Sequence, residues 1–425
     1  WDDRFNTKGL MMFYENNKWD YQNVDTIPIE NGARDFVDIV EDPRELGHYF
    51  VSSYGEGIYE FRNKKLVKIH DHSNSAIETV NIDFLKGQNH FDRTYGLCYD
   101  KNSNLYIINS YTPNIIKIYT KDGNWISLNY QAIANNEAIF DIMQTRKGVF
   151  WVLSPWKNPG IFVFDPKPTL SNQTDDQYKF INPINYLDNL EIKSITPSAF
   201  YCLAEDKNGV IWAGTDMGPI VFNSPSKVFS DNFMGSRIKV PRNDGTQLAD
   251  YLLESEKIRT ICVDGGNRKW IGTESNGVYL VSDNGQETIF HFTSENSPLL
   301  SNKVLSIAIH PLTGEVFIGT DKGLVSYRSD AIEGKSTYSD VYTFPNPVRP
   351  DYEGLITITG LLANSTVRIT DINGNSIFEG ISEGGQITWN GRNRAGNHLS
   401  SGVYLVYAAT SDGLDGIVSK ILILK

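Results

Sequence analysis

Residues 205–215 read Glu205-Asp206-Lys207-Asn208-Gly209-Val210-Ile211-Trp212-Ala213-Gly214-Thr215, a polar turn followed by an apolar strand. Close copies run over residues 263–273 and 313–324, and weaker copies centre on Tyr49, Tyr106 and Trp151. One copy is too short to bury its own apolar face, so neighbouring copies must pack against it. The sequence therefore predicts a repeat protein built from short β-strands.

The spacing of the copies indicates the type of repeat. The third strand of each copy is expected to begin near Ile58, Ile115, Ile161, Ile220, Val278 and Leu324. These positions lie 57, 46, 59, 58 and 46 residues apart. Four short strands with their turns need about 40–50 residues, which is the size of a propeller blade. We therefore predict an all-β chain with a six- to seven-bladed β-propeller over residues 1–335.

Three segments do not follow the blade pattern. Residues 9–21 match only the third and fourth strands of a blade, so they either close the ring beside the last repeat or continue a blade that begins upstream. Residues 165–197 are polar, and we expect an extended outer loop there. Residues 248–257 are expected to form a short helix.

A second β unit is predicted over residues 340–425. Its expected strands cover residues 355–359, 366–370, 387–389, 401–407 and 419–425, with a hairpin turn at Asp371-Ile372-Asn373-Gly374-Asn375. Short strands with regular turn signals are typical of a small β-sandwich. The last strand has four aliphatic residues in a row, which predicts burial on both faces.

The charge of the chain excludes some functions and leaves others open. A net charge of -12 disfavours nucleic-acid binding, which depends on phosphate neutralisation by Lys and Arg. The sequence has no apolar run of about 18 residues, so we expect no transmembrane segment. Cys98, Cys202 and Cys262 each fall in the first strand of a different repeat, so buried free thiols are expected rather than disulfides.

The sequence contains none of the common catalytic, phosphate-binding or zinc-protease motifs. His70 and His72 could share a metal ion, because alternate residues of a strand face the same side, but a solvated turn explains them better. Asp206, Asp264 and Asp321 recur at turns, where carboxylates bind calcium or, more commonly, cap Asx turns. We therefore expect no cofactor, no metal and no enzymatic activity.

Two basic clusters are candidates for contact with a ligand or partner. Arg62, Lys64 and Lys65 lie on a predicted outer hairpin of a blade, whereas Arg237, Lys239 and Arg242 lie in a long connection. The alternative for both clusters is a solvated strand edge, where lysine prevents aggregation.

The C-terminal unit resembles the C-terminal domain of proteins handled by the type IX secretion system. The residues that carry this resemblance are Pro345, Asn346, Pro347, Gly374, Trp389, Gly391, Gly402, Tyr404, Lys420 and Lys425. The preceding part resembles propellers of the two-component-regulator type, whose blade phrase is close to Asp-x-x-Gly-x-Ile-Trp-x-Gly-Thr. Together the two parts resemble the PorZ-like surface components of the type IX attachment complex, which carry two propellers before the tail.

That resemblance implies a function. It implies a non-enzymatic protein at the cell surface, associated with the outer membrane after secretion through the periplasm. Such a protein binds anionic lipopolysaccharide and delivers it to the sortase that removes C-terminal domains from cargo. The implied partners are this sortase and its outer-membrane shuttle and anchor proteins.

Two other functions remain open at the level of the sequence. A secreted carbohydrate-active or glycan-binding propeller could use the same sorting tail, because propeller active sites are assembled from distant loops. A sensor ectodomain is the third interpretation, and it is disfavoured because no spanning helix follows the propeller.

Overall fold

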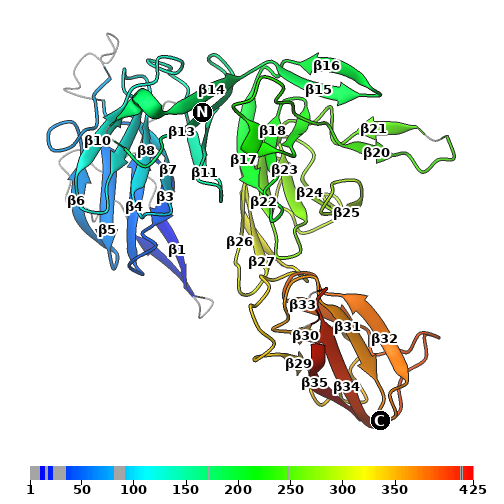
Figure 1. Ribbon diagram of the computed structural model, residues 1–425. Helices are drawn as coiled ribbons and strands as arrows, with labels where there is room; N and C mark the ends of the chain where they lie inside the picture. Colours follow the sequence, from blue (N-terminus) through cyan, green and yellow to red (C-terminus); the bar gives the residue numbers. More distant parts are fainter. Residues whose placement is uncertain are drawn as a thin grey trace. The chain divides into compact units, whose positions relative to one another are not determined.

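The computed structural model describes residues 10–14, 18–22, 35–80, 91–170, 172–246, 248–411, 413 and 415–424. The elements in this part are β-strands, apart from two single-turn 3-10 helices at Gln173–Asp175 and Pro225–Lys227 (Figure 1). The all-β prediction is confirmed. The chain divides into two compact units. Unit 1 comprises Trp1–Leu203 and Phe222–Ser236, and unit 2 comprises Ala204–Val221 and Arg237–Lys425.

Unit 1 holds three four-stranded antiparallel sheets, each in chain order. The first sheet is formed by β3 (Phe36–Glu41), β4 (His48–Ser53), β5 (Gly57–Arg62) and β6 (Lys65–His70). The second contains β7 (Thr94–Tyr99), β8 (Leu105–Asn109), β9 (Ile116–Tyr119) and β10 (Trp125–Leu128). The third contains β11 (Asp141–Gln144), β12 (Phe150–Ser154), β13 (Gly160–Asp165) and β14 (Gln177–Ile181). Two hairpins accompany them, β1–β2 (Leu10–Tyr14, Lys18–Gln22) and β15–β16 (Ile184–Asp188, Glu191–Ile195).

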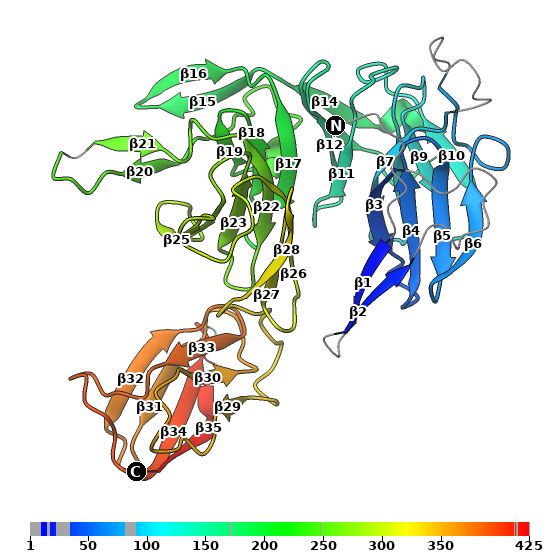
Figure 2. The ribbon, with the colours of Figure 1, turned by 180° about the vertical axis from the view of Figure 1, so that it is seen from behind.

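A three-stranded sheet of β17 (Phe200–Glu205), β18 (Ile211–Thr215) and β19 (Gly218–Phe222) follows, most of it in unit 2. Unit 2 continues with a four-stranded sheet of β22 (Ile258–Val263), β23 (Lys269–Thr273), β24 (Val278–Val281) and β25 (Thr288–Phe292). The next sheet is formed by β26 (Val304–Ile309), β27 (Glu315–Thr320) and β28 (Gly323–Arg328). The hairpin β20–β21 (Lys239–Pro241, Ala249–Tyr251) precedes them (Figure 2).

The last part of unit 2 consists of two packed sheets. One contains β29 (Tyr342–Phe344), β30 (Ile356–Thr359) and β33 (Gln386–Trp389). The other has the order β32 (Ser376–Ile381), β31 (Thr366–Thr370), β34 (Gly402–Ala409), β35 (Asp415–Ile423). Ile358 and Trp389 of the first sheet share one buried core with Ile369, Val406 and Ile421 of the second. This arrangement is the predicted small β-sandwich.

The predicted third strands are found as β5, β9, β13, β19, β24 and β28. The number of blades and the domain boundaries stay predictions. Two expectations about the segments outside the blade pattern are wrong. Residues 165–197 are not a plain loop, because they contain β14 and the β15–β16 hairpin. Residues 248–257 do not form a helix, because Ala249–Tyr251 pairs with Lys239–Pro241. Hairpin pairing there overrides the local helix propensity.

A glycine opens the third strand where the chain passes very close to the end of the fourth. Gly57 and Gly277 have φ values of +82° and +73°. A Cβ at these positions would lie 2.2 Å from the carbonyl oxygen of His70 and 2.1 Å from that of Phe292. Only glycine combines this backbone conformation with so close an approach, which explains why the repeated phrase ends in Gly-aliphatic.

The first sheet contains a buried row of charged and imidazole groups. His48 lies between two carboxylates, with Nδ1 3.0 Å from Asp42 Oδ2 and Nε2 3.0 Å from Glu60 Oε1. His70 Nε2 lies 2.9 Å from the other Glu60 oxygen. The interpretation of His70 as part of a solvated turn is therefore wrong, since its side chain is buried against Glu60.

Acid should weaken unit 1 through Asp42. Its pKa is lowered from 3.8 to about 2, mainly because Arg44 donates hydrogen bonds to the carboxylate. A carboxyl group with a lowered folded pKa stabilises the fold above its unfolded pKa, and this contribution is lost as pH falls through the folded value. We expect the free energy of unfolding to fall between about pH 4 and pH 2. Urea unfolding at several pH values measures this.

The Asp42→Asn variant should lose part of this acid dependence, whereas Asp122→Asn, at an exposed turn, should keep it. If the free energy of unfolding falls equally with pH in the wild type and in Asp42→Asn, the role given to Asp42 is contradicted.

Candidate functional site

A groove of about 630 Å³ lies over the second and third sheets of unit 1. Four lysines line it, one from each of four connections. Lys101 comes from the β7–β8 turn, Lys121 from the β9–β10 turn, Lys147 from the β11–β12 turn and Lys167 from the β13–β14 connection. In an antiparallel sheet of consecutive strands, the first and third connections lie at the same end. The topology therefore gathers these lysines at one end of two neighbouring sheets.

Most of the positive charge in this groove has no protein partner. Lys101, Lys121 and Lys147 are exposed and, within the described residues, have no carboxylate partner. Lys167 instead forms an ion pair with Asp165, at 2.5 Å. The Asp100 carboxylate is buried and accepts hydrogen bonds from Asn102 N, Asn104 N and Asn104 Nδ2, all at 2.8 Å. Asp122 is the remaining carboxylate of the lining.

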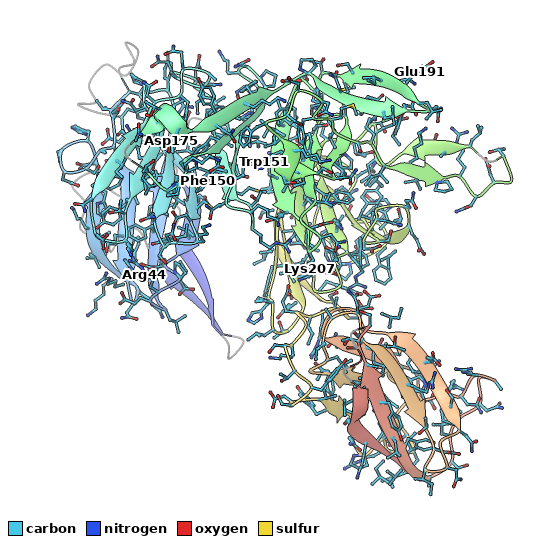
Figure 3. The ribbon with its side chains drawn as sticks, viewed as in Figure 1. Arg44, Phe150, Trp151, Asp175, Glu191 and Lys207 are labelled. Carbon is cyan, nitrogen blue, oxygen red and sulfur yellow. The ribbon has the colours of Figure 1, made fainter. Side chains whose placement is uncertain are left out.

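The base of the groove is aromatic and rigid. Phe150 of β12, labelled in Figure 3, is fully buried, as is Tyr106 of β8. The centroids of these two rings lie 4.1 Å apart, and Phe150 stacks on Phe164 at 4.9 Å. Burial raises the pKa of the Tyr106 phenol, so this hydroxyl stays protonated. The groove can therefore hold the phosphate or carboxylate groups of an anionic ligand through lysine ammonium groups on a fixed base.

Sequence reasoning missed these lysines because each turn contributes only one. The available signal was a basic residue in the turn after the first or third strand of consecutive blades, as in Asp100-Lys101, Lys121-Asp122 and Arg146-Lys147.

The first predicted basic cluster lies where it was expected. Asn63 and Lys64 form the two-residue turn of the β5–β6 hairpin, and Arg62 and Lys65 lie opposite each other in the strand register. Arg62 lies 3.6 Å from Glu45 and 3.9 Å from Glu60, so part of its charge is balanced locally. A role in ligand contact stays a prediction for Arg62, Lys64 and Lys65.

The second predicted cluster lies on the β20–β21 hairpin and is largely paired. The Arg237 guanidinium packs 3.9 Å over the Tyr251 ring and lies 3.5 Å from Glu254. Arg242 donates two hydrogen bonds to the Asp250 carboxylate, at 2.8 and 2.6 Å. Lys239 also faces the Tyr251 ring, at 5.9 Å. These pairings reduce the charge that Arg237 and Arg242 can offer to an anion.

The turn aspartates confirm the Asx interpretation at two positions. Asp206 Oδ1 accepts hydrogen bonds from the Asn208 and Val210 amides, at 2.9 and 3.0 Å. Asp264 Oδ1 does the same with Gly266 and Arg268, at 2.9 and 3.0 Å. Each carboxylate also pairs with a buried cation, Lys269 on Asp206 at 2.9 Å and Arg268 on Asp264 at 2.8 Å. Asp321 is exposed.

The residues of the C-terminal signature have structural positions in the β-sandwich. Asn346, between Pro345 and Pro347, lies in the segment that follows β29, and its side chain connects this segment with β35. Its Nδ2 donates to the Lys420 carbonyl at 2.8 Å, and its Oδ1 accepts from Leu422 N at 2.9 Å. Gly374 and Gly391 have positive φ values. Lys425 lies outside the described residues.

Two of the signature aromatics brace neighbouring turns. Trp389 is buried, and its Nε1 donates to the Arg392 carbonyl at 2.8 Å. Tyr404, two residues after Gly402, donates its hydroxyl to the Ser400 carbonyl at 3.0 Å. The expected burial of the last strand on both faces is wrong, because Ile421 and Ile423 are buried while Leu422 and Leu424 are exposed. The strand lies at the edge of its sheet, with one face on the core.

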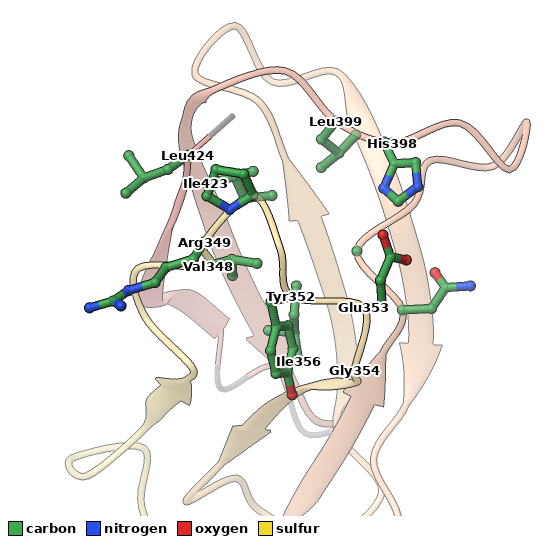
Figure 4. Close-up of a pocket in the computed structure, with 13 residues that line it drawn as sticks. Val348, Arg349, Tyr352, Glu353, Gly354, Ile356, His398, Leu399, Ile423 and Leu424 are labelled. Carbon is green, nitrogen blue, oxygen red and sulfur yellow. The ribbon is translucent and has the colours of Figure 1, made fainter.

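A second hollow, of about 360 Å³, lies beside this edge in the β-sandwich (Figure 4). Val348, Ile356 and Ile423 supply apolar walls, and Arg349 and Glu353 supply charge. The three cysteines are free and half-buried, so the expected absence of disulfides among them is confirmed but full burial is not. Among the described residues there is no helix with the length and hydropathy needed to cross a membrane.

Comparisons with known proteins agree with this architecture. The family model "Two component regulator propeller" matches residues 194–217. The chain is similar to PorZ, an essential bacterial surface component of the type-IX secretion system of Porphyromonas gingivalis, with 26% identity and a TM-score of 0.73. This similarity covers 100% of the present chain and 57% of the PorZ chain, so the chain spans little more than half the length of that relative.

A second similar structure is the extracellular domain of BT4673 from B. thetaiotaomicron, with 15% identity and a TM-score of 0.49. That match covers 99% of the present chain and 55% of the other. None of the curated proteins compared with the chain matches it. The similarity to PorZ along the whole chain, together with the blade sheets and the regulator-propeller phrase, supports the resemblance to PorZ-like propeller proteins.

Proposed function

We propose that this chain is a non-enzymatic cell-surface component of a type IX secretion machinery, which binds anionic lipopolysaccharide and delivers it to the C-terminal-domain sortase. The observation that carries the proposal is the similarity to PorZ over the full length of the chain. Its partners would be the sortase and the outer-membrane shuttle and anchor proteins. The β-sandwich at residues 342–423 would serve as the domain that the sorting machinery recognises.

The lysine-lined groove supports the binding part of this proposal. With a net charge of -12, the chain repels polyanions at long range, so an anionic glycan needs a local cluster of free positive charge. Lys101, Lys121 and Lys147 provide such a cluster, whereas Arg237 and Arg242 already have carboxylate partners. The groove is lined by residues of two sheets, which suits an extended saccharide better than a small substrate.

Removing the three free lysines should weaken glycan binding strongly. We expect the triple variant Lys101→Ser, Lys121→Ser, Lys147→Ser to bind anionic lipopolysaccharide at least about tenfold more weakly, since each lost charge contact contributes roughly 1 kcal/mol or more. Rising salt should weaken the wild type and affect the variant less. Surface plasmon resonance on immobilised lipopolysaccharide, with a neutral glycan as reference, measures both effects.

The control removes the same amount of charge from another place in unit 1. The variant Arg62→Ser, Lys64→Ser, Lys65→Ser tests the other predicted cluster, and if the groove holds the glycan, this variant should bind nearly as well as the wild type. Loss of binding in this variant alone would place the glycan on the β5–β6 hairpin and overturn the assignment to the groove. Failure of the wild type to bind would overturn the proposed lipopolysaccharide function of this chain.

A further inference from the structure

Three potential metal ligands meet between the first and second sheets of unit 1. Asp71 and His72 directly follow β6, and Asp92 lies two residues before β7. One ligand atom from each side chain lies within 4.8 Å of the others. In the part of the chain that the structure describes, this is the one group of His, Cys, Asp and Glu side chains that lie this close together.

Asp92 makes this group more than a cluster of surface charges. The residue is completely buried, and its Oδ2 accepts a hydrogen bond from the His72 amide at 2.9 Å and lies 2.8 Å from His72 Nδ1. Its other oxygen, Oδ1, is buried without a hydrogen-bond partner. A buried carboxylate oxygen without a partner is costly. The adjacent Arg93 does not relieve it, because its guanidinium packs 4.3 Å over the Tyr54 ring.

Asp71 is held in a fixed orientation at the open side of the group. Its Oδ1 accepts hydrogen bonds from Ser73 N at 2.8 Å, Ser73 Oγ at 2.6 Å and Asn74 Nδ2 at 3.1 Å. Hydrogen bonds of this kind orient the ligands of metal sites. Asp71 and His72 are partly exposed, so an ion can reach the group from solvent while Asp92 closes its inner side.

We propose that Asp71, His72 and Asp92 bind one divalent transition-metal ion, of the class of Mn²⁺ and Zn²⁺. One imidazole nitrogen with two carboxylates suits these ions, whereas Ca²⁺ and Mg²⁺ prefer oxygen ligands alone. His72 Nδ1 is the nitrogen that lies on the side of Asp92, at 2.8 Å from its Oδ2. The remaining coordination positions are filled by water.

The position of the group gives the ion a structural role. Asp71 and His72 belong to the end of one sheet, and Asp92 to the start of the next. A metal ion at this point links the two ends of the connection between consecutive sheets. Its bonds to both ends offset the entropy that is lost when the loop is closed. The proposal does not depend on the lipopolysaccharide function, since the ligands lie on connections other than those that form the lysine-lined groove.

Mn²⁺ is the best first probe, because the three free thiols of the chain would also bind Zn²⁺. We expect electron paramagnetic resonance titration of the chelator-treated chain to show one Mn²⁺ site. The variants Asp71→Asn and His72→Gln, at partly exposed positions, should each lower the affinity for Mn²⁺ at least about tenfold. Saturating Mn²⁺ should raise the Tm of the wild type by about 2–4 °C and leave that of the double variant unchanged.

The Asp122→Asn variant removes an exposed carboxylate elsewhere in the same unit and should bind Mn²⁺ like the wild type. Equal Mn²⁺ affinity in the wild type and in the Asp71→Asn, His72→Gln double variant would overturn the site. Binding of Ca²⁺ more tightly than Mn²⁺ would overturn the assigned class of ion. Both substitutions leave the buried Asp92 and its hydrogen bond from the backbone amide of residue 72 in place, so circular dichroism spectra of both variants should match that of the wild type.

Discussion

Replacing Lys269 by methionine is expected to lower the free energy of unfolding by about 3–5 kcal/mol, because the change leaves a buried carboxylate without its cation. Lys269 is fully buried, and its Nζ lies 2.9 Å from Asp206 Oδ2, whose side chain is 3% exposed. The ammonium also donates to the carbonyl oxygens of Asn267 and Asp283, at 2.8 and 2.5 Å, and lies 4.8 Å from the Trp212 ring centroid.

The pKa of Asp206 explains why this change costs so much. Burial alone would raise it, but Lys269 and the backbone amides of the Asx turn outweigh burial and lower it. The carboxylate is therefore charged in the folded protein, and methionine cannot compensate for that charge. Chemical denaturation followed by circular dichroism and tryptophan fluorescence measures the loss.

Two further variants test this reasoning. Lys303 forms an exposed pair with Glu274 at 3.2 Å, and Lys303→Met should cost at most about 1 kcal/mol. Adding Asp206→Asn to Lys269→Met should recover part of the loss, because it removes the uncompensated charge. If Lys269→Met and Lys303→Met unfold at the same denaturant concentration, the buried pair does not stabilise unit 2.

Replacing Trp151 by alanine should destabilise unit 1 by about 3–5 kcal/mol, through the loss of apolar burial and the cavity left behind. Trp151 of β12 is fully buried, and its ring lies 5.3 Å from Phe222 and 6.4 Å from Phe233. Its indole Nε1 has no hydrogen-bond partner, so the effect comes from packing alone. Urea unfolding with far-ultraviolet circular dichroism measures the change.

The matched control is another tryptophan in the same unit. Trp156 is 48% exposed and packs edge-to-face against Phe140, with ring centroids 4.7 Å apart. Trp156→Ala makes the same chemical change at the surface and should cost about 1 kcal/mol or less. Similar losses in both variants would show that the burial of Trp151 does not determine its contribution.

The sequence predicted the strands well because the repeat encodes them locally. The Asx turn at Asp206, the buried Trp212 and the glycine before Val278 each follow from side-chain chemistry within one blade. The helix expected at residues 248–257 failed because its partner strand, Lys239–Pro241, is separated from it along the chain. Local propensity cannot register such a pairing.

The candidate sites depend on contacts that one blade does not contain. Lys101 and Lys147 come together only because two sheets lie side by side in unit 1. His70 and His72 were paired by strand alternation, yet His70 contacts Glu60 and His72 contacts Asp92. Likewise, the charge of Arg242 is matched by Asp250 on the opposite strand of its hairpin. Partners of this kind become visible only in the folded chain.

The close approach of the strand-opening glycines to the fourth strand bears on how such a chain can change in length. At Gly57 and Gly277, the third strand and the end of the fourth are fixed to each other without room for a methyl group. The links between the second and third strands are also short, as between Ser53 and Gly57 or between Thr273 and Val278. Insertions are then tolerated mainly after the third strand or between sheets, as in the segments 166–176 and 71–93. The irregular repeat period thus reflects connections of different length around strands whose mutual contacts leave little room for change.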